Sequence, residues 1–194
     1  SVVTPISSSY ALVAVVLSIL FLGESITLFQ TFGIALAIIG VVLVSFKWRD
    51  IIKLNFSHFA AGSKYAFIPM VGWGIMFVMI GFLTPQLGWI IPILAVRMMS
   101  VIYLSSYAKA SRTDISFPKT AALFVFLVAV GEFLGWMAYN FSITMEYTAV
   151  MVPIGASYPI VTVALAYVFL KERMEINQVL GIALAITGII FISV

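Results

Sequence analysis

The sequence contains no cysteine and only one histidine, His58. The first absence excludes a disulfide framework and a thiolate metal site, and the second argues strongly against a metal site built on histidine. Charge is also scarce, because charged residues make up 9% of the chain, whereas an ordinary soluble domain carries about 25%. So little polar surface cannot cover a soluble fold, so we expect lipid to be the solvent for most of the chain.

The scarcity of polar residues excludes several classes of function. The net charge is only +3 and the basic residues do not form a run, which argues against nucleic acid as a partner. Both aspartates, Asp50 and Asp114, fall between apolar segments, and there is neither a G-x-S-x-G motif nor a glycine-rich phosphate loop with lysine. We therefore expect no enzymatic activity, no cofactor and no nucleotide-driven transport within this chain.

Long apolar segments are what the sequence does contain: hydrophobic residues make up 63% of it, and the mean hydropathy is +1.21. Each segment has about the 20 residues that a helix needs to cross the hydrocarbon core. A membrane barrel would instead alternate polar and apolar residues. The sequence predicts an all-α, polytopic transmembrane helix bundle with seven spanning helices, over residues 3–22, 27–46, 64–83, 88–107, 119–142, 147–170 and 175–194.

One helical hairpin occurs twice. The phrase FGIALAIIG (32–40) returns as LGIALAITG (180–188), 148 positions later. The same offset, without a gap, also aligns residues that composition alone would not match: Pro5 with Pro153, Ser9 with Ser157, Tyr10 with Tyr158, Glu24 with Glu172, Gln30 with Gln178, Gly33 with Gly181 and Gly40 with Gly188. We interpret the first and last helix pairs as copies of one duplicated unit.

The two copies differ in what precedes them, because three predicted helices stand before the second hairpin and none before the first. We expect residues 1–46 to be the C-terminal hairpin of a first repeat, residues 63–194 to be a complete five-helix repeat, and about 85 residues to precede the chain in the intact protein. An odd number of helices per repeat inverts the second repeat in the membrane. Inverted repeats that enclose a site near the bilayer midplane are a transporter architecture.

The distribution of positive charge agrees with inversion. The corner near Glu172 carries Lys171 and Arg173, whereas its counterpart near Glu24 has no basic residue. All basic residues except Arg97 fall on one predicted side, which the positive-inside rule makes cytoplasmic, so that the C-terminus lies outside. They are Lys47, Arg49, Lys53, Lys64, Lys109, Arg112, Lys119, Lys171 and Arg173.

The duplicated pattern resembles the EamA domain of the drug/metabolite transporter superfamily. It consists of a proline that opens a helix, a Leu-(Gly/Lys)-Glu corner, a glutamine and the phrase Gly-Ile-Ala-Leu-Ala-Ile-x-Gly, and the resemblance extends over nearly the whole chain. It implies a ten-helix carrier of two EamA repeats that moves small metabolites such as amino acids, nucleoside-like compounds or drugs. Ten-helix members of the family keep both termini in the cytoplasm, so the resemblance and the charge distribution leave two orientations open.

Two ionisable residues, Arg97 and Glu132, lie about 15–20 Å from the loop that joins their helices, near the midplane. A charge at the centre of the bilayer costs at least about 2.5–3.5 kcal/mol and commonly marks a pathway, a proton relay or a counter-ion. The predicted helices are adjacent and antiparallel, so the two side chains are expected to point into the bundle and face each other. The functional interpretation is substrate binding by Arg97 or proton coupling by Glu132, and the structural alternative is an ion pair that locks the two helices together.

Aromatic and amide residues follow Glu132 at helical spacing. Trp136 and Tyr139 share its helix face and Asn140 is adjacent, which suits the wall of a cavity for a small organic substrate. The alternative for Trp136 and Tyr139 is an interfacial aromatic belt.

Ser9 and Tyr10 in the first hairpin, and Ser157 and Tyr158 in the second, occupy matched positions just inside helices that open on proline. They are candidates to line the cavity from both repeats, although serine hydroxyls can also bond to backbone carbonyls of their own helix.

Together these features predict a secondary transporter in the plasma membrane that moves a small organic metabolite by alternating access. The alternative is a membrane scaffold that does not transport, or a channel. The lipid bilayer and a small-molecule substrate are the expected partners, with a proton as the candidate coupling ion. We expect the chain alone not to transport, unless a homodimer supplies the missing wall of the cavity.

Overall fold

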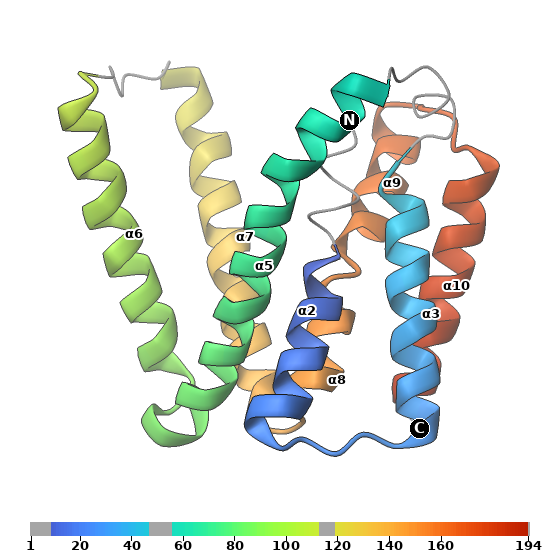
Figure 1. Cartoon of the computed structure of the whole chain (residues 1–194). Coiled ribbons are helices and arrows are strands. Elements are labelled where there is room, and N and C mark those ends of the chain that lie inside the picture. The colour runs from blue at the N-terminus through green and yellow to red at the C-terminus, as the bar shows by residue number, and fades with distance from the viewer. Residues whose placement is uncertain (1–8, 47–55, 113–118, 194) are drawn as a thin grey trace. The chain divides into compact units, whose positions relative to one another are not determined.

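The computed structural model describes residues 9–46, 56–112 and 119–193, and these residues form helices and short connections without a β-strand (Figure 1). Four segments are long and apolar enough to cross a membrane: Tyr65–Leu87, Ile90–Ala110, Thr120–Ile143 and Thr148–Phe169. Three further apolar helices are shorter as described, Tyr10–Leu22, Leu28–Val44 and Ile176–Ile192. The chain is therefore the all-α membrane helix bundle that its composition predicts.

In order, its elements are α2 (Tyr10–Leu17), the π-helix η1 (Ser18–Leu22), α3 (Leu28–Val44), α5 (Phe56–Leu87), α6 (Ile90–Ala110), α7 (Lys119–Ile143), α8 (Thr148–Gly155), α9 (Tyr158–Phe169) and α10 (Ile176–Ile192).

Two of these elements differ from the sequence-based expectation. Helix α5 begins at Phe56, well before the expected start at residue 64. The single helix expected over 147–170 is divided into α8 and α9, which follow each other across Ala156 and Ser157. The beginning of the first expected helix, residues 3–8, lies outside the described residues.

The chain divides into two compact units. The first comprises Ser1–Gly81 and Glu146–Val194 and contains both copies of the repeated hairpin, together with α8 and most of α5. The second comprises Phe82–Met145 and contains the antiparallel pair α6 and α7.

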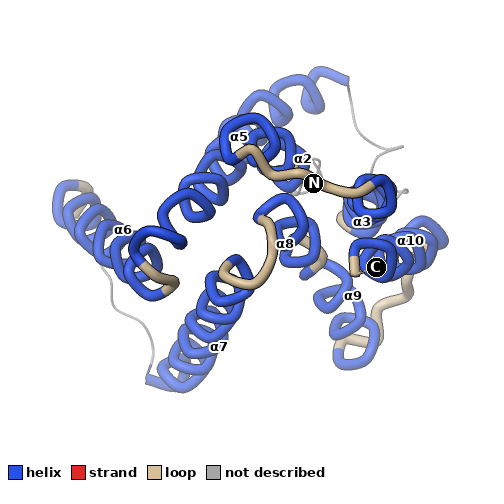
Figure 2. The backbone as a smooth tube through the Cα atoms, turned by 90° about the horizontal axis from the view of Figure 1, so that it is seen from below, coloured by secondary structure: helices blue, strands red, loops and turns tan. Residues whose placement is uncertain are grey.

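Helices α3 and α10 form the most extensive helix pair of the first unit and lie side by side in both views (Figures 1 and 2). A Cβ atom added to Gly33 would stand 2.7 Å from the carbonyl oxygen of Gly188, and one added to Gly40 would stand 2.6 Å from that of Gly181. Only glycine allows the two backbones to approach so closely. The glycines that the repeat duplicates are therefore the residues at which its two copies meet.

The pairing of these glycines has two-fold symmetry. The 148-residue offset matches Gly33 with Gly181 and Gly40 with Gly188. The contact between Gly33 and Gly188 is therefore the symmetry equivalent of the contact between Gly40 and Gly181. The beginning of α3 meets the end of α10, which makes the helices antiparallel. A two-fold axis that relates antiparallel helices is perpendicular to both of them, and for spanning helices such an axis lies in the membrane plane. This is the inverted repeat that the sequence predicts.

The N-termini of α3 and α10 are built in the same way in both copies. The Thr27 N–H donates to Gln30 Oε1 (2.9 Å) and the Gln30 N–H donates to Thr27 Oγ1 (3.2 Å). At the matched positions the Glu175 N–H donates to Gln178 Oε1 (3.1 Å), and the Glu175 side chain accepts from the Gln178 backbone. Both arrangements are capping boxes, which explains why the glutamine recurs in the duplicated hairpin.

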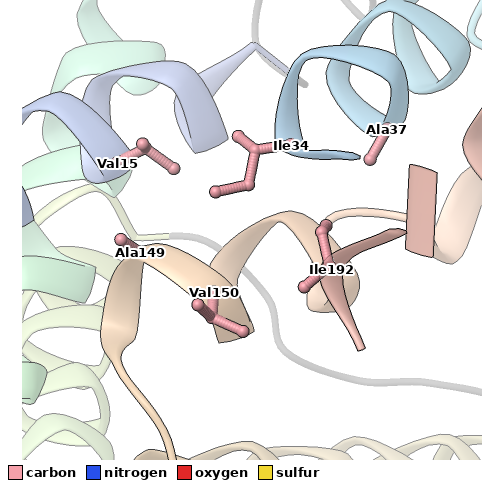
Figure 3. Packing of buried hydrophobic residues seen from close by; sticks show 6 residues of the cluster. All are labelled: Val15, Ile34, Ala37, Ala149, Val150 and Ile192. Carbon is pink, nitrogen blue, oxygen red and sulfur yellow. The ribbon is translucent and has the colours of Figure 1, made fainter. Parts of the chain in front are cut away.

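The core of the first unit lies where α2, α3, α8 and α10 meet (Figure 3). Six buried apolar side chains from these four helices form it: Val15, Ile34, Ala37, Ala149, Val150 and Ile192. The core joins both copies of the hairpin to the beginning of α8.

Glu24, at the corner between η1 and α3, reaches the beginning of α8. Its two carboxylate oxygens accept from the backbone N–H groups of Thr148 (2.8 Å) and Ala149 (2.7 Å). These donors have no partner within their own helix, and the helix dipole favours a negative charge at this end. Glu24 therefore caps the N-terminus of α8 and so links the first hairpin to that helix.

Candidate functional site

The first candidate site belongs to the second unit and is centred on an ion pair between its two helices. Arg97 lies within α6 and Glu132 within α7, each several residues from the ends of its helix. Arg97 Nη2 stands 3.0 Å from Glu132 Oε1, and the two side chains are 36% and 55% exposed. The structure thus brings together the two ionisable residues that the sequence singles out at membrane depth.

Trp136 completes the surroundings of Arg97. It lies one helical turn after Glu132 on α7, and its ring centroid is 5.6 Å from Arg97 Cζ. A guanidinium over an indole is attracted by the negative face of the ring, an interaction that strengthens when water is removed. Arg97 therefore contacts both Glu132 and Trp136, which hold its position from one face of α7.

Tyr139 and Asn140 follow this cluster along α7, and their side chains make different contacts. The Tyr139 ring meets the Trp136 ring edge to face, with centroids 6.1 Å apart, so it continues the aromatic wall. Asn140 is fully buried, and its Nδ2 donates to the Trp136 carbonyl (2.9 Å). Its Oδ1 has no hydrogen-bond partner among the described residues. Because of that buried acceptor, Asn140 stays a candidate site residue. Among the described residues it makes no contact with Arg97.

The second candidate site belongs to the first unit and lies at a break in the helices. Ser157 separates α8 from α9 with φ −78° and ψ 4°, and Ser9 precedes α2 with φ −75° and ψ 4°. These matched serines therefore share one non-helical backbone conformation. Pro159 has no N–H to donate to the carbonyl of Gly155, which explains the end of α8. In transporters built from inverted repeats, discontinuous helices of this kind form substrate and ion sites.

The tyrosines that follow the two serines differ in exposure. Tyr10 is partly buried, whereas Tyr158 is about half exposed. The two copies of the repeat thus give their duplicated tyrosine different surroundings.

Two aromatic residues of α5 also belong to this site and were missed from the sequence. The Tyr10 ring stacks on Phe77 with centroids 5.2 Å apart and lies 6.3 Å from Trp73. Trp73 and Phe77 are four residues apart and therefore share one helix face. That spacing was the available signal, but an aromatic pair in an apolar helix does not by itself distinguish a site from ordinary packing.

The serine hydroxyl of the second copy is already engaged. Ser157 is buried, and its Oγ donates to the carbonyl of Pro153 at 3.0 Å. A serine hydroxyl bonded to its own helix in this way is the alternative to a cavity-lining role. Ser157 therefore shapes the helix break, and the Tyr158 ring is the more accessible group.

The chemistry of the first site is electrostatic. A half-exposed carboxylate and guanidinium within apolar helices would be costly against lipid, so water, protein or a ligand must cover them in the membrane. The exposed parts of Arg97 can accommodate an anionic group, those of Glu132 a cationic group, and Trp136 an apolar or planar one. The arrangement is suited to binding a small polar molecule.

Comparison with known proteins identifies the family. The model of the EamA-like transporter family matches residues 1–46 and 60–194. Uncharacterized protein MJ1333.1 of Methanocaldococcus jannaschii is 31% identical over 110 residues, which are 57% of this chain and 77% of that protein. The family match extends over both hairpins and over the helices between them. This chain belongs to the EamA-like transporter family.

Proposed function

We propose that this protein is a secondary transporter that moves a small organic metabolite across the plasma membrane by alternating access. The observation that carries the proposal is the Arg97–Glu132 pair, a partly exposed ion pair within long apolar helices of a transporter-family chain. Such a pair is expensive in lipid and useful in a water-filled binding cavity. Trp136 supplies the aromatic surface that a small organic molecule requires.

The repeat supports the domain organisation of this proposal. Residues 1–46 are the C-terminal hairpin of one EamA repeat, and residues 63–194 are a second, five-helix repeat. The antiparallel, two-fold pairing of α3 and α10 is the geometry that two inverted halves need in order to rock against each other. We assign to the substrate site the helix break at Ser157 and the matched Ser9 at the start of α2, together with the tyrosines that follow them.

A proton is the proposed coupling ion, with Glu132 as its carrier. Protonation would neutralise the carboxylate and release Arg97 from the ion pair, which links the protonation state to the charge offered to a substrate. A homodimer is the proposed assembly if one copy of the chain cannot enclose the cavity.

The test is flux of a metabolite panel in proteoliposomes that contain the full-length protein, measured with and without a pH gradient. Saturable flux that Arg97→Gln and Glu132→Gln each reduce by roughly tenfold or more is expected. Tyr103→Phe is the matched control, because Tyr103 is exposed on the same helix as Arg97. Failure of every metabolite to move, or undiminished flux in both charge variants, would overturn the proposal. Flux that does not respond to the gradient would remove the proton from it.

A further inference from the structure

We propose that α8 is a gate helix, which Glu24 latches at its beginning and which swings on the helix break at its end. The inference rests on the proposed function, because a gate has a purpose only where a path across the membrane opens and closes. It names the element that moves and the contact that holds it, both of which the proposed function leaves open.

The latch joins two corners of the bundle that come from different repeats. The two carboxylate oxygens of Glu24 accept from the backbone N–H groups of Thr148 (2.8 Å) and Ala149 (2.7 Å), the first two residues of α8. Hydrogen bonds to a charged acceptor are stronger than neutral ones. Glu24 is only partly buried, so water can replace it at these donors when α8 moves away. The contact can therefore hold α8 and still open reversibly.

The hinge is the break between α8 and α9. Helix α8 comprises only the eight residues Thr148–Gly155, and Ser157 has a non-helical backbone with φ −78° and ψ 4°. Pro159 has no N–H to donate to the carbonyl of Gly155, so the hydrogen-bond ladder is interrupted between α8 and α9. A few residues at the end of an element are enough to absorb the backbone change of a hinged motion. Helix α8 can thus swing without moving α9.

The contacts of α8 differ in kind from those within the α3–α10 pair. The backbones of α3 and α10 approach closely at both pairs of matched glycines, and Asn177 Nδ2 of α10 donates to the Leu43 carbonyl of α3 at 3.0 Å. Helix α8 instead contributes Ala149 and Val150 to the shared core. In lipid the hydrophobic effect does not drive apolar helices together, so the bonds of Glu24 are a main restraint on α8. The α3–α10 pair is the fixed body against which α8 moves.

The experiment measures how often α8 leaves the core, by the reaction of a buried thiol with a membrane-impermeant methanethiosulfonate reagent. Because the chain contains no cysteine, an introduced cysteine is its only thiol. Val150→Cys places the reporter in α8, where Val150 is 3% exposed, and Val41→Cys places a reference in α3, where Val41 is 2% exposed. The full-length protein in lipid nanodiscs is used, with any cysteine outside this chain replaced by serine. When α8 closes faster than the thiol reacts, the reaction rate is proportional to the open fraction.

Two variants remove the latch from its opposite sides. Glu24→Gln loses the charge and one accepting oxygen, so we expect the Val150→Cys thiol to react roughly tenfold faster. Thr148→Pro removes one donor, and proline fits there because Thr148 is the first residue of α8 and the preceding Tyr147 is extended (φ −61°, ψ 145°). We expect it to raise the rate roughly threefold or more, and it is the form to use if Glu24→Gln does not fold. Glu146→Gln changes a nearby charge but no bond of the latch, and should leave the rate unchanged.

Pro159→Ala tests the hinge. It restores an N–H that can donate to the carbonyl of Gly155, and a continuous helix over α8 and α9 would resist the swing. In the Glu24→Gln background we expect it to slow the reaction of the Val150→Cys thiol roughly threefold or more. An unchanged rate would overturn the hinged gate.

The outcomes separate this inference from the proposed function. Equal rates at Val150→Cys with and without Glu24→Gln would show that there is no latch. The same acceleration at Val41→Cys as at Val150→Cys would show a general loosening of the bundle, and either result overturns the gate. Saturable flux through a protein with such rates would leave transport standing without this gate. The expected pattern of rates in a protein that moves no metabolite would uphold the latched, hinged helix and overturn transport.

Discussion

Gly23 and Lys171 share one backbone conformation. Both are left-handed, with φ of 67° and 55°, and the 148-residue offset places them at the same point of the two hairpins. The hairpin geometry thus imposes the same turn on two different residues. Glycine adopts this conformation without a steric cost, whereas a residue with a side chain pays roughly 1–2 kcal/mol.

Lys171→Gly is therefore expected to stabilise the protein by about 1 kcal/mol. Reversible unfolding in mixed micelles, followed by circular dichroism, measures the change. Lys171→Ala is the control, because it removes the charge and keeps the strain. If the alanine variant gains as much stability as the glycine variant, the loss of charge and not the relief of strain is the cause.

Gly40→Ala is expected to destabilise the protein by about 1–3 kcal/mol through overpacking. An added Cβ would stand 2.5 Å from the Ala185 backbone nitrogen and 2.6 Å from the Gly181 carbonyl oxygen, so α3 and α10 would have to move apart. Gly135→Ala is the matched control in α7, since nothing in the described part of the chain lies within 4 Å of its added Cβ. Unfolding curves of equal midpoint for the two variants would contradict the close approach of α3 and α10.

The two capping glutamines should differ in their contribution to stability. Gln30 caps a partly exposed helix end, whereas Gln178 is buried and its Nε2 also donates to the Val44 carbonyl at 3.4 Å. Gln178→Ala removes the donor to the Val44 carbonyl, in a buried hydrogen bond, and the acceptor of the Glu175 N–H, in a part-buried one. We expect it to cost about 1–2 kcal/mol more than Gln30→Ala. Equal losses in free energy of unfolding would mean that the two boxes are equivalent despite their different burial.

Much of this fold could be predicted because the duplication is visible in the sequence. Matched glycines and glutamines at one offset indicated two copies of one hairpin, and the structure shows these residues at the α3–α10 contact and at the helix caps. Apolar length indicated the helices themselves. The break at Ser157 was not predicted, because the segment is apolar throughout and membrane helices also contain proline without breaking.

The candidate site was predictable to the extent that charge is rare. Arg97 and Glu132 stand out in an apolar chain, and adjacent antiparallel helices can bring them together. The placement of Trp136 over Arg97 depends on side-chain rotamers and on the packing of α6 against α7, which spacing along one helix does not determine. For the same reason Trp73 and Phe77, whose contacts with Tyr10 join different helices, were not recognised.

Glu24→Gln is expected to destabilise the protein by about 1–2 kcal/mol, because it breaks the cap at the beginning of α8. The carboxylate accepts from two successive backbone N–H groups, those of Thr148 and Ala149, with one oxygen each. An amide has only one accepting oxygen, so glutamine can satisfy one donor at most and brings no negative charge to the helix end. Since Ala149 is part of the core that joins the two hairpins, the loss should appear in the global unfolding transition and not only as local fraying of α8.

The matched control for Glu24 is Glu146→Gln. Glu146 is exposed, lies two residues before the first residue of α8 and carries the same charge to the same helix end. Its neutralisation removes a nearby charge without removing a hydrogen bond to the helix, so a loss well below 1 kcal/mol is expected. The difference between the two variants isolates the two hydrogen bonds from the effect of charge. A loss for Glu146→Gln as large as that for Glu24→Gln would show that charge near the helix end, and not the cap, stabilises the beginning of α8.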